Sequence, residues 1–181
     1  MRKLVFLTSC ILLLFIGCGE KDTTFLITEE SVGKLDKISL VRDLELIYAN
    51  DSIVKDTLIS RIGAGVQKVK IFEKGGKHLL TLTPSKDSIP TVENIQVLDE
   101  RFVSEAGIGL SSTFGDIQKK YTIKKIVTAL NNVVIFVNET SMYFTIDKDQ
   151  LPENLRYSMA TVETVQIPEE AKIKYLMIGW E

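Results

Sequence analysis

The side chains that most often perform catalysis are scarce in this chain of 181 residues. His78 is the only histidine, so a Ser-His-Asp triad would have to include it. It follows the glycine pair Gly75-Gly76 in a segment of alternating apolar residues, where it is expected to share a face with Leu80 and Leu82. A hydrogen-bonded structural histidine is the simpler interpretation. Because zinc sites usually need several His or Cys ligands, we expect neither a metal nor a cofactor.

Carboxylates are the remaining candidates for acid–base chemistry. They are grouped as Glu29-Glu30, Asp147-Lys148-Asp149 and Glu169-Glu170. Asp147 and Asp149 lack the following glycine and the distal glutamate of a calcium loop. Solvated carboxylates in turns are the simpler interpretation of all these groups. The chain is therefore predicted to have no catalytic residue and not to be an enzyme, with a carboxylate-dependent hydrolase of glycans as the alternative.

Cys18 is the residue whose neighbours most clearly predict a reaction. The chain begins with the basic segment Met1-Arg2-Lys3, continues with a largely apolar run over residues 4–16, and becomes polar directly after Gly17-Cys18. A basic segment followed by a short apolar run is typical of a secretory signal peptide. The run is shorter than the about 20 residues that a membrane-spanning helix needs, so we do not expect a permanent span.

The segment Phe15-Ile16-Gly17-Cys18 resembles a lipobox, the processing signal of bacterial envelope lipoproteins. In that family the cysteine thiol receives a diacylglyceryl group, the chain is cut after the small residue, and the cysteine becomes an acylated N-terminus. The resemblance implies that residues 1–17 are removed, that cleavage lies between Gly17 and Cys18, and that residues 18–24 form a lipid-bearing tether. Fatty acyl chains such as palmitate on Cys18 would then hold the protein on a membrane. An ordinary signal peptide with a cysteine by chance is the alternative.

The same segment predicts where the protein is located. Gly19 stands where an aspartate would resemble an inner-membrane retention signal, so we expect a lipid anchor in the outer membrane, facing the periplasm or the cell surface. Loss of Arg2 and Lys3 would make the chain more acidic than its formal net charge of −2, which argues against nucleic acid as a partner. With Cys10 removed and Cys18 acylated, no thiol would remain, and the folded part would depend on its hydrophobic core.

Beyond the tether, the apolar pattern predicts mainly strands. The strand candidates are residues 25–28, 66–73, 77–83, 91–99, 133–137, 142–146 and 173–178, and residues 66–73 show the period of two residues that is typical of a strand. Gly75-Gly76 joins two of these segments and predicts a hairpin. Residues 173–178 are apolar on both sides, which favours an interior strand over an edge strand. Residues 39–48 and 112–121 instead have the spacing of a helical face, with Ser39 as the expected N-cap of the first helix.

These two helical segments correspond position by position, which predicts an internal repeat. The paired residues are Ser39 with Ser112, Val41 with Phe114, Asp43 with Asp116, Leu44 with Ile117, and Tyr48 with Tyr121. A glycine precedes each segment, as Gly33 and as Gly109. Two unrelated helices within one domain are the alternative.

The motif formed by Gly109, Ser112-Thr113-Phe114, Asp116-Ile117 and Tyr121 is similar to the glycine–Ser/Thr–helix motif of BamE-like lipoproteins and of tandem-repeat β-lactamase inhibitor proteins. The resemblance implies an α+β fold, with a mainly antiparallel sheet and two short helices packed on one face. Residues 25–181 would form a single domain of two tandem helix–strand–hairpin repeats, roughly 25–99 and 100–181.

The expected function is that of a non-catalytic envelope lipoprotein that binds or scaffolds another envelope component, for which an envelope protein is a candidate partner. Trp180 could plug the core or contact that partner, and the core is favoured. The alternatives from other functional classes are the glycan hydrolase and an inhibitor of a secreted hydrolase, the latter only by the resemblance to inhibitor proteins.

Overall fold

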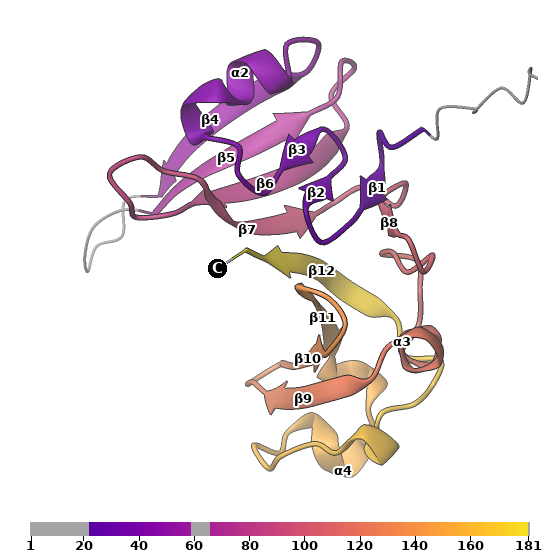
Figure 1. Ribbon diagram of the computed structural model, residues 1–181. Helices are drawn as coiled ribbons and strands as arrows, with labels where there is room; N and C mark the ends of the chain where they lie inside the picture. Colours follow the sequence, from indigo (N-terminus) through magenta and orange to yellow (C-terminus); the bar gives the residue numbers. More distant parts are fainter. Residues whose placement is uncertain (1–21, 59–65, 181) are drawn as a thin grey trace, which may run out of the picture.

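The computed structural model describes residues 22–58 and 66–180, and these residues form two β-sheets. The larger sheet has eight strands in the order β4-β5-β6-β7-β12-β11-β10-β9, all antiparallel to their neighbours (Figure 1). Their bounds are β4 Ser52–Leu58, β5 Val66–Phe72, β6 His78–Pro84, β7 Val92–Val97, β9 Ile123–Thr128, β10 Asn132–Val137, β11 Met142–Asp147 and β12 Ile173–Gly179. The smaller sheet has the order β3-β2-β1-β8, with β1 Leu26–Ile27, β2 Ser31–Val32, β3 Leu35–Asp36 and β8 Val103–Ser104.

The helices are short. The α-helices are α2 Leu44–Ile47, α3 Phe114–Lys120 and α4 Glu153–Arg156, and the 3-10 helices are η1 Val41–Asp43, η2 Lys148–Gln150 and η3 Thr164–Gln166. The predicted α+β fold with a face of two packed helices is therefore wrong, because the described chain is mostly β-structure. The smaller sheet was not predicted from the sequence. Together with the helices and loops, it covers the core. No helix in the described part has both the length and the hydrophobicity needed to cross a membrane.

One face of the larger sheet forms the core. The register aligns one apolar residue from each of several neighbouring strands, and these residues are at most 1% exposed: Ile71, Leu80, Val97, Leu176, Phe144 and Ile135. Ile27 and Leu35 of the smaller sheet, Leu44 of α2 and Phe114 of α3 belong to the same buried cluster. Burial of each such side chain contributes about 1.5–3 kcal/mol before the entropy of folding is subtracted, so this face holds the two sheets together.

Two glycines allow close backbone approaches in the layer that covers the core. Gly33 has a φ of 58°, and a Cβ atom there would lie 2.4 Å from the carbonyl oxygen of Thr24. A Cβ atom on Gly109 would lie 2.6 Å from the carbonyl oxygen of Phe102. Any other residue would force the backbone apart at these positions, which explains why a glycine precedes each helical segment.

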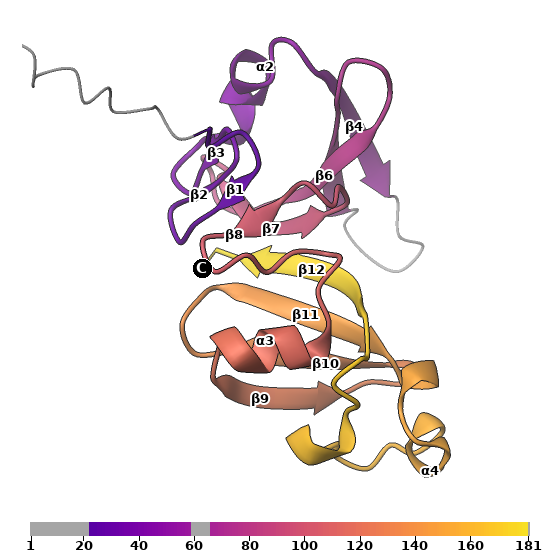
Figure 2. The ribbon, with the colours of Figure 1, turned by 90° about the vertical axis from the view of Figure 1, so that its right-hand side faces the viewer.

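The larger sheet consists of two halves, which Figures 1 and 2 show one above the other. The strands β4–β7 form the upper half of Figure 1 and the strands β9–β12 form the lower half. They join where β7 pairs with β12, through Val97 opposite Leu176 and Ile95 opposite Ile178. Both views place α3 on the core side of the lower strands, and no described helix lies on their other side.

Candidate functional site

We call the side of the larger sheet that points away from the core the open face. The register gives its central row, which runs across all the strands: Val54, Lys70, Thr81, Gln96, Met177, Tyr143, Phe136 and Lys125. These residues alternate with the buried residues of the core face because successive side chains of a strand point to opposite sides. Polar, charged and aromatic side chains therefore share this surface.

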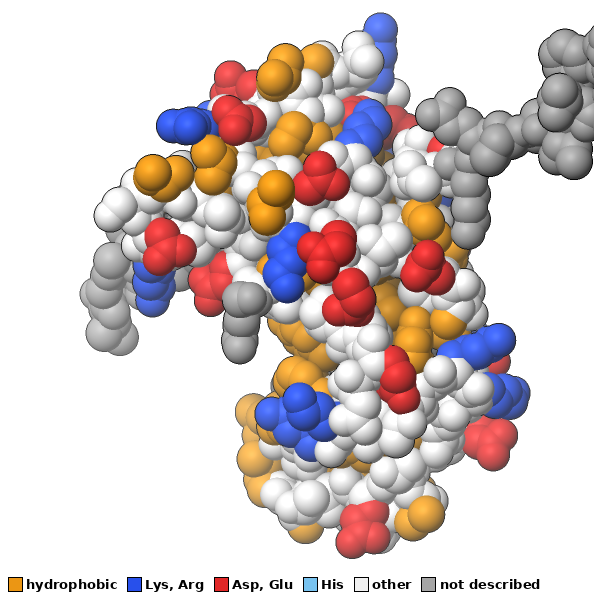
Figure 3. Space-filling model, in the orientation of Figure 1, with side chains coloured by type: hydrophobic (Ala, Val, Ile, Leu, Met, Phe, Trp, Pro, Cys, Tyr) orange, Lys and Arg blue, Asp and Glu red, His pale blue; other side chains and the backbone are white. Residues whose placement is uncertain are grey.

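A hollow of about 510 Å³ lies on the open face, where β7 and β12 approach β9–β11. It is lined by Glu93, Asn94, Lys124, Lys125, Phe136, Val137, Thr140, Ser141, Met142, Tyr143 and Gly179. Figure 3 shows the molecule hollowed on its left side between the two halves, with Lys or Arg side chains on the lower wall. Small-molecule sites commonly have volumes of about 300–1,000 Å³, so the hollow is large enough for a ligand.

The lower wall of the hollow is shaped by a β-bulge in β9. Lys125 lies opposite Phe136, whereas Ile123 lies opposite Val137, so Lys124 is an extra residue without an opposite partner. A bulge re-aims the side chains around it, and here both Lys124 and Lys125 are exposed and line the hollow.

Aromatic rings support this wall. The Lys125 Nζ atom lies 4.5 Å from the centre of the Phe136 ring. The Phe136 ring stacks on that of Tyr143, with the ring centres 5.3 Å apart. The cation–π contact and the stacking together fix the direction of Lys125.

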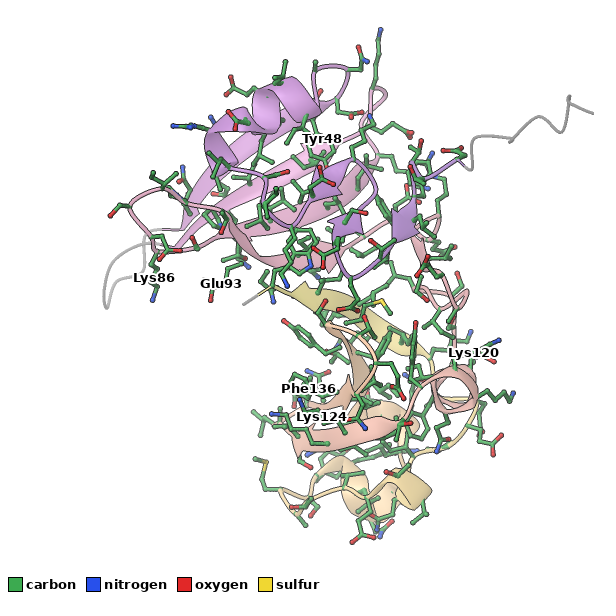
Figure 4. The ribbon with its side chains drawn as sticks, viewed as in Figure 1. Tyr48, Lys86, Glu93, Lys120, Lys124 and Phe136 are labelled. Carbon is green, nitrogen blue, oxygen red and sulfur yellow. The ribbon has the colours of Figure 1, made fainter. Side chains whose placement is uncertain are left out.

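The upper wall is formed by the start of β7 and the end of β12. Glu93 lies across the hollow from Lys124 and Phe136 (Figure 4). The neighbouring Asn94 donates a hydrogen bond from Nδ2 to the Tyr143 hydroxyl at 2.6 Å, which connects the two walls. Ser141 also lines the hollow, and its hydroxyl is buried without a hydrogen-bond partner among the described residues.

The carboxyl groups of the hollow differ from those of a glycoside hydrolase. The lining of the hollow contains a single carboxylate, that of Glu93, whereas glycoside hydrolysis by acid–base chemistry uses a pair. A general acid also needs a raised pKa. The described carboxyl groups with a shifted pKa all shift downward: Asp22, Glu45, Glu73, Asp99, Asp116, Glu139 and Asp147. In Glu139, for example, hydrogen bonding from Thr122 lowers the pKa. These groups give no support to the hydrolase alternative.

The residues singled out from the sequence do not meet in this hollow. Gly17 and Cys18 lie outside the described residues, so lipidation stays a prediction. Trp180 is 4% exposed and belongs to the core cluster, which is the position that the sequence favours. Its indole Nε1 is buried without a hydrogen-bond partner among the described residues. Contact with a partner would require the ring to leave this position.

The predicted carboxylate clusters have structural contacts. Asp147 accepts a hydrogen bond from the Lys174 ammonium at 2.6 Å and another from the backbone N–H of Asp149 at 3.2 Å. Lys148, between them, is 2% exposed and donates to the carbonyl oxygens of Leu130 and Ser158. No group of three or more His, Cys, Asp or Glu side chains arranged to hold a metal ion occurs within residues 22–58 and 66–180.

The lysine pair of the hollow was not among the residues predicted from the sequence. The available signal was the run Ile123-Lys124-Lys125-Ile126, where two consecutive polar residues interrupt the alternation of a strand. Such an interruption is consistent with a bulge, but the hollow itself depends on Glu93 and Asn94, which are distant in the sequence.

Comparison with known proteins shows the fold of this chain and no more. No family model matches it, and no curated protein matches it. Among solved structures, it is similar to the uncharacterized protein YfeY from Escherichia coli, with a TM-score of 0.59 and 15% sequence identity. The match covers 84% of this chain and 98% of YfeY. The likeness thus extends over both halves of the larger sheet, whereas the predicted resemblances to lipobox and BamE-like proteins are not confirmed by it.

Proposed function

We propose that the protein is a lipid-anchored component of the bacterial cell envelope that binds another envelope component through the open face. The observation that carries this proposal is the hollow between Glu93 and Lys124 (Figure 4). It combines charged, hydrogen-bonding and aromatic side chains on a sheet surface that no described helix covers. Ligand sites typically combine an apolar wall with a few polar groups in this way.

The position of the N-terminal end supports this proposal. β1, the first strand of the described residues, lies on the core side of the molecule, at the right of Figure 1. The hollow lies on the opposite side, at the left of Figure 3. A tether attached through Cys18 would therefore leave the open face accessible to a partner.

Photocrosslinking in intact envelopes tests this function. A photoreactive phenylalanine derivative replaces Tyr175 in one version of the full-length chain and Leu46 in the other. Tyr175 is 40% exposed and lies next to Met177 on the strand that crosses the open face. Leu46 is 80% exposed on α2, in the layer that covers the core.

We expect a discrete crosslinked product from position 175 and none from position 46. Equal labelling from both positions would indicate nonspecific contact, and a product from position 46 alone would move the binding surface to the other side of the molecule. Absence of any product from position 175 would contradict the proposal.

A further inference from the structure

We propose that the hollow binds an oxyanion, a phosphate or a carboxylate carried by a small polar ligand, between Lys124 and Lys125. This inference rests on the proposed function, because it takes the open face as the binding surface, and it adds the charge class of the ligand. It is carried by the bulge of β9, by the charges around the hollow, and by the hydrogen-bond donors that line it.

The bulge brings two positive charges to one small surface. Lys124 and Lys125 are consecutive and both line the hollow, although consecutive residues of a regular strand point to opposite faces. A bound anion would therefore be attracted by both positive charges.

Neither ammonium has an acidic partner among the described residues. No carboxylate of residues 22–58 or 66–180 lies within the 4.0 Å ion-pair limit of either one, and the Lys125 ammonium lies over the face of the Phe136 ring. Other lysines of the same sheet are paired: the Lys70 ammonium lies 2.8 Å from Asp56 and that of Lys174 lies 2.6 Å from Asp147. Glu93 is the single acidic residue of the lining, so the hollow carries an excess of positive charge.

Neutral donors accompany the two ammonium groups. The Tyr143 hydroxyl accepts a hydrogen bond from Asn94, which leaves its own proton available for an oxygen atom of a ligand. The Ser141 hydroxyl is buried in the wall of the hollow and has no described partner, so a turn of this side chain toward the hollow would let it donate to a bound acceptor. Ammonium and hydroxyl groups together suit an oxyanion, since hydrogen bonds to ionised acceptors are stronger than those to neutral ones.

Calorimetric titration of the full-length protein in a nonionic detergent tests the inference. Glucose 1-phosphate, glucuronate and glucose serve as the probes, because they share a sugar ring and differ in bearing a phosphate, a carboxylate or no charge. We expect at least one of the two anions to bind and glucose to bind at least about tenfold more weakly, because hydrogen bonds to an ionised acceptor are stronger than those to a neutral one. Preference for glucose 1-phosphate would identify a phosphate ligand, and preference for glucuronate a carboxylate ligand.

The chain offers a matched control for the charge change. The double variant Lys124→Gln/Lys125→Gln should lose about tenfold or more in affinity for the preferred anion. The double variant Lys119→Gln/Lys120→Gln removes the same charge from another consecutive pair, in the last turn of α3, far from the hollow in Figure 4. It should change the affinity by less than about twofold. Both lysines of the hollow are exposed, so circular dichroism should show that both double variants fold as the original chain does.

Three results would overturn the inference: no binding of either anion, binding of glucose as tight as that of the anions, or equal losses in the two double variants. These results are independent of the crosslinking experiment. A crosslink from position 175 without anion binding would remove the oxyanion site and leave the proposed function intact. Anion binding without a crosslink would support the oxyanion site and contradict the proposed binding of an envelope component through the open face.

Discussion

His78 contributes the single imidazole of the chain to the open face. Its Nε2 atom lies 3.2 Å from the carbonyl oxygen of Leu80 and 3.1 Å from the hydroxyl of Thr81. Its ring stacks on that of Phe72, with the centres 4.4 Å apart. These contacts hold the ring against the sheet and away from the hollow residues, which is the structural role that a lone histidine suggests.

This environment makes the stability of the protein depend on pH. Partial burial lowers the pKa of His78 below its ordinary value, so the folded protein takes up the proton less readily than the unfolded chain. Neutral His78 therefore contributes fully to the free energy of unfolding above about pH 6.5. This contribution is lost as the pH falls through and below that value. We expect the free energy of unfolding to decrease between pH 7 and about pH 5, and to decrease less in His78→Gln.

Urea unfolding at several pH values, together with an NMR titration of the imidazole, measures both quantities. The carboxyl groups titrate mainly below about pH 5, so the chosen range isolates the histidine. An imidazole pKa at or above its ordinary value would contradict this prediction.

Asp99 is the buried centre of an ionic network whose other members are partly exposed. Its side chain is fully buried, and its Oδ2 atom lies 2.7 Å from the Arg101 guanidinium and 3.1 Å from the Lys77 ammonium. The Arg101 guanidinium also binds Glu73, which is 37% exposed. Hydrogen bonding from Arg101 holds the pKa of Asp99 well below its usual range, so its stabilising effect is present at neutral pH and is lost only in strong acid.

Removal of the Asp99 charge should destabilise the protein. We expect Asp99→Asn to lower the free energy of unfolding by about 1.5–2 kcal/mol, because the buried carboxylate loses its charged hydrogen bonds, whereas Arg101 and Lys77 are partly exposed and remain solvated. Glu73→Gln, at the exposed end of the same network, should cost less than about 1 kcal/mol. Urea denaturation at pH 7 measures both values. Equal losses in the two variants would contradict the claim that Asp99 contributes more to stability than Glu73.

Single residues also show where sequence reasoning fails. His78 was expected on the face of Leu80 and Leu82, but the register between β5 and β6 shifts at Ile71/Phe72, and the ring contacts Phe72 and Thr81 instead. The same kind of shift in β9 produces the lysine pair of the hollow. A bulge changes which side a residue faces, and the alternation of apolar residues does not reveal its position.

At the scale of elements, the ends of the helices distinguish the two helical segments. Thr113 caps α3: its hydroxyl accepts from the backbone N–H of Asp116 at 3.3 Å, and its own backbone N–H donates to the Asp116 carboxylate at 3.0 Å. Ser39 was predicted to cap the first helix, which is wrong, since Leu40 precedes η1 and has no capping side-chain bond. The Ser39 hydroxyl accepts from the backbone N–H of Asp36 at 3.2 Å.

This difference predicts unequal effects of alanine at the two positions. Thr113→Ala should lower the free energy of unfolding by about 1 kcal/mol, because the capping box is lost. Ser39→Ala should cost less than about half as much, because it removes only an exposed turn contact. Thermal or urea unfolding of both variants measures the difference. Equal destabilisation would mean that the cap contributes nothing beyond an ordinary side-chain hydrogen bond.

The sequence predicted the longer strands better than it predicted the helices. The predicted hairpin at Gly75-Gly76 is confirmed by β5 and β6, with φ values of 114° and 95° at the two glycines. The predicted interior strand over residues 173–178 is confirmed by β12, which lies between β7 and β11. β1, β2, β3 and β8 have two residues each, which is too short for any period to be visible.

For the molecule as a whole, the predicted fold class is wrong because the short strands of the smaller sheet were not predicted. A sequence with two helical segments and many strands suggested helices over a sheet, but tertiary contacts brought segments 77 residues apart, Leu26 and Val103, into one smaller sheet. The hollow is equally nonlocal, because it needs β7 from one half of the larger sheet and β9–β12 from the other. The sequence shows Lys124 and Lys125 as two consecutive polar residues, but it shows neither that both line one hollow nor which residues form the opposite wall.

The anchor is the remaining property of the whole molecule, and Cys18→Ser tests it. If the lipobox resemblance is correct, this variant should remain uncleaved, fail to incorporate labelled palmitate, and leave the outer-membrane fraction, because the acyl chains supply the membrane affinity. Cys10→Ser is the matched control: it removes the other cysteine from within the apolar run and should be processed and labelled normally. Metabolic labelling and membrane fractionation in the native bacterium measure these outcomes. If Cys18→Ser were processed and retained like the unchanged chain, the predicted anchor would be wrong, and the open face would have to reach its partner without it.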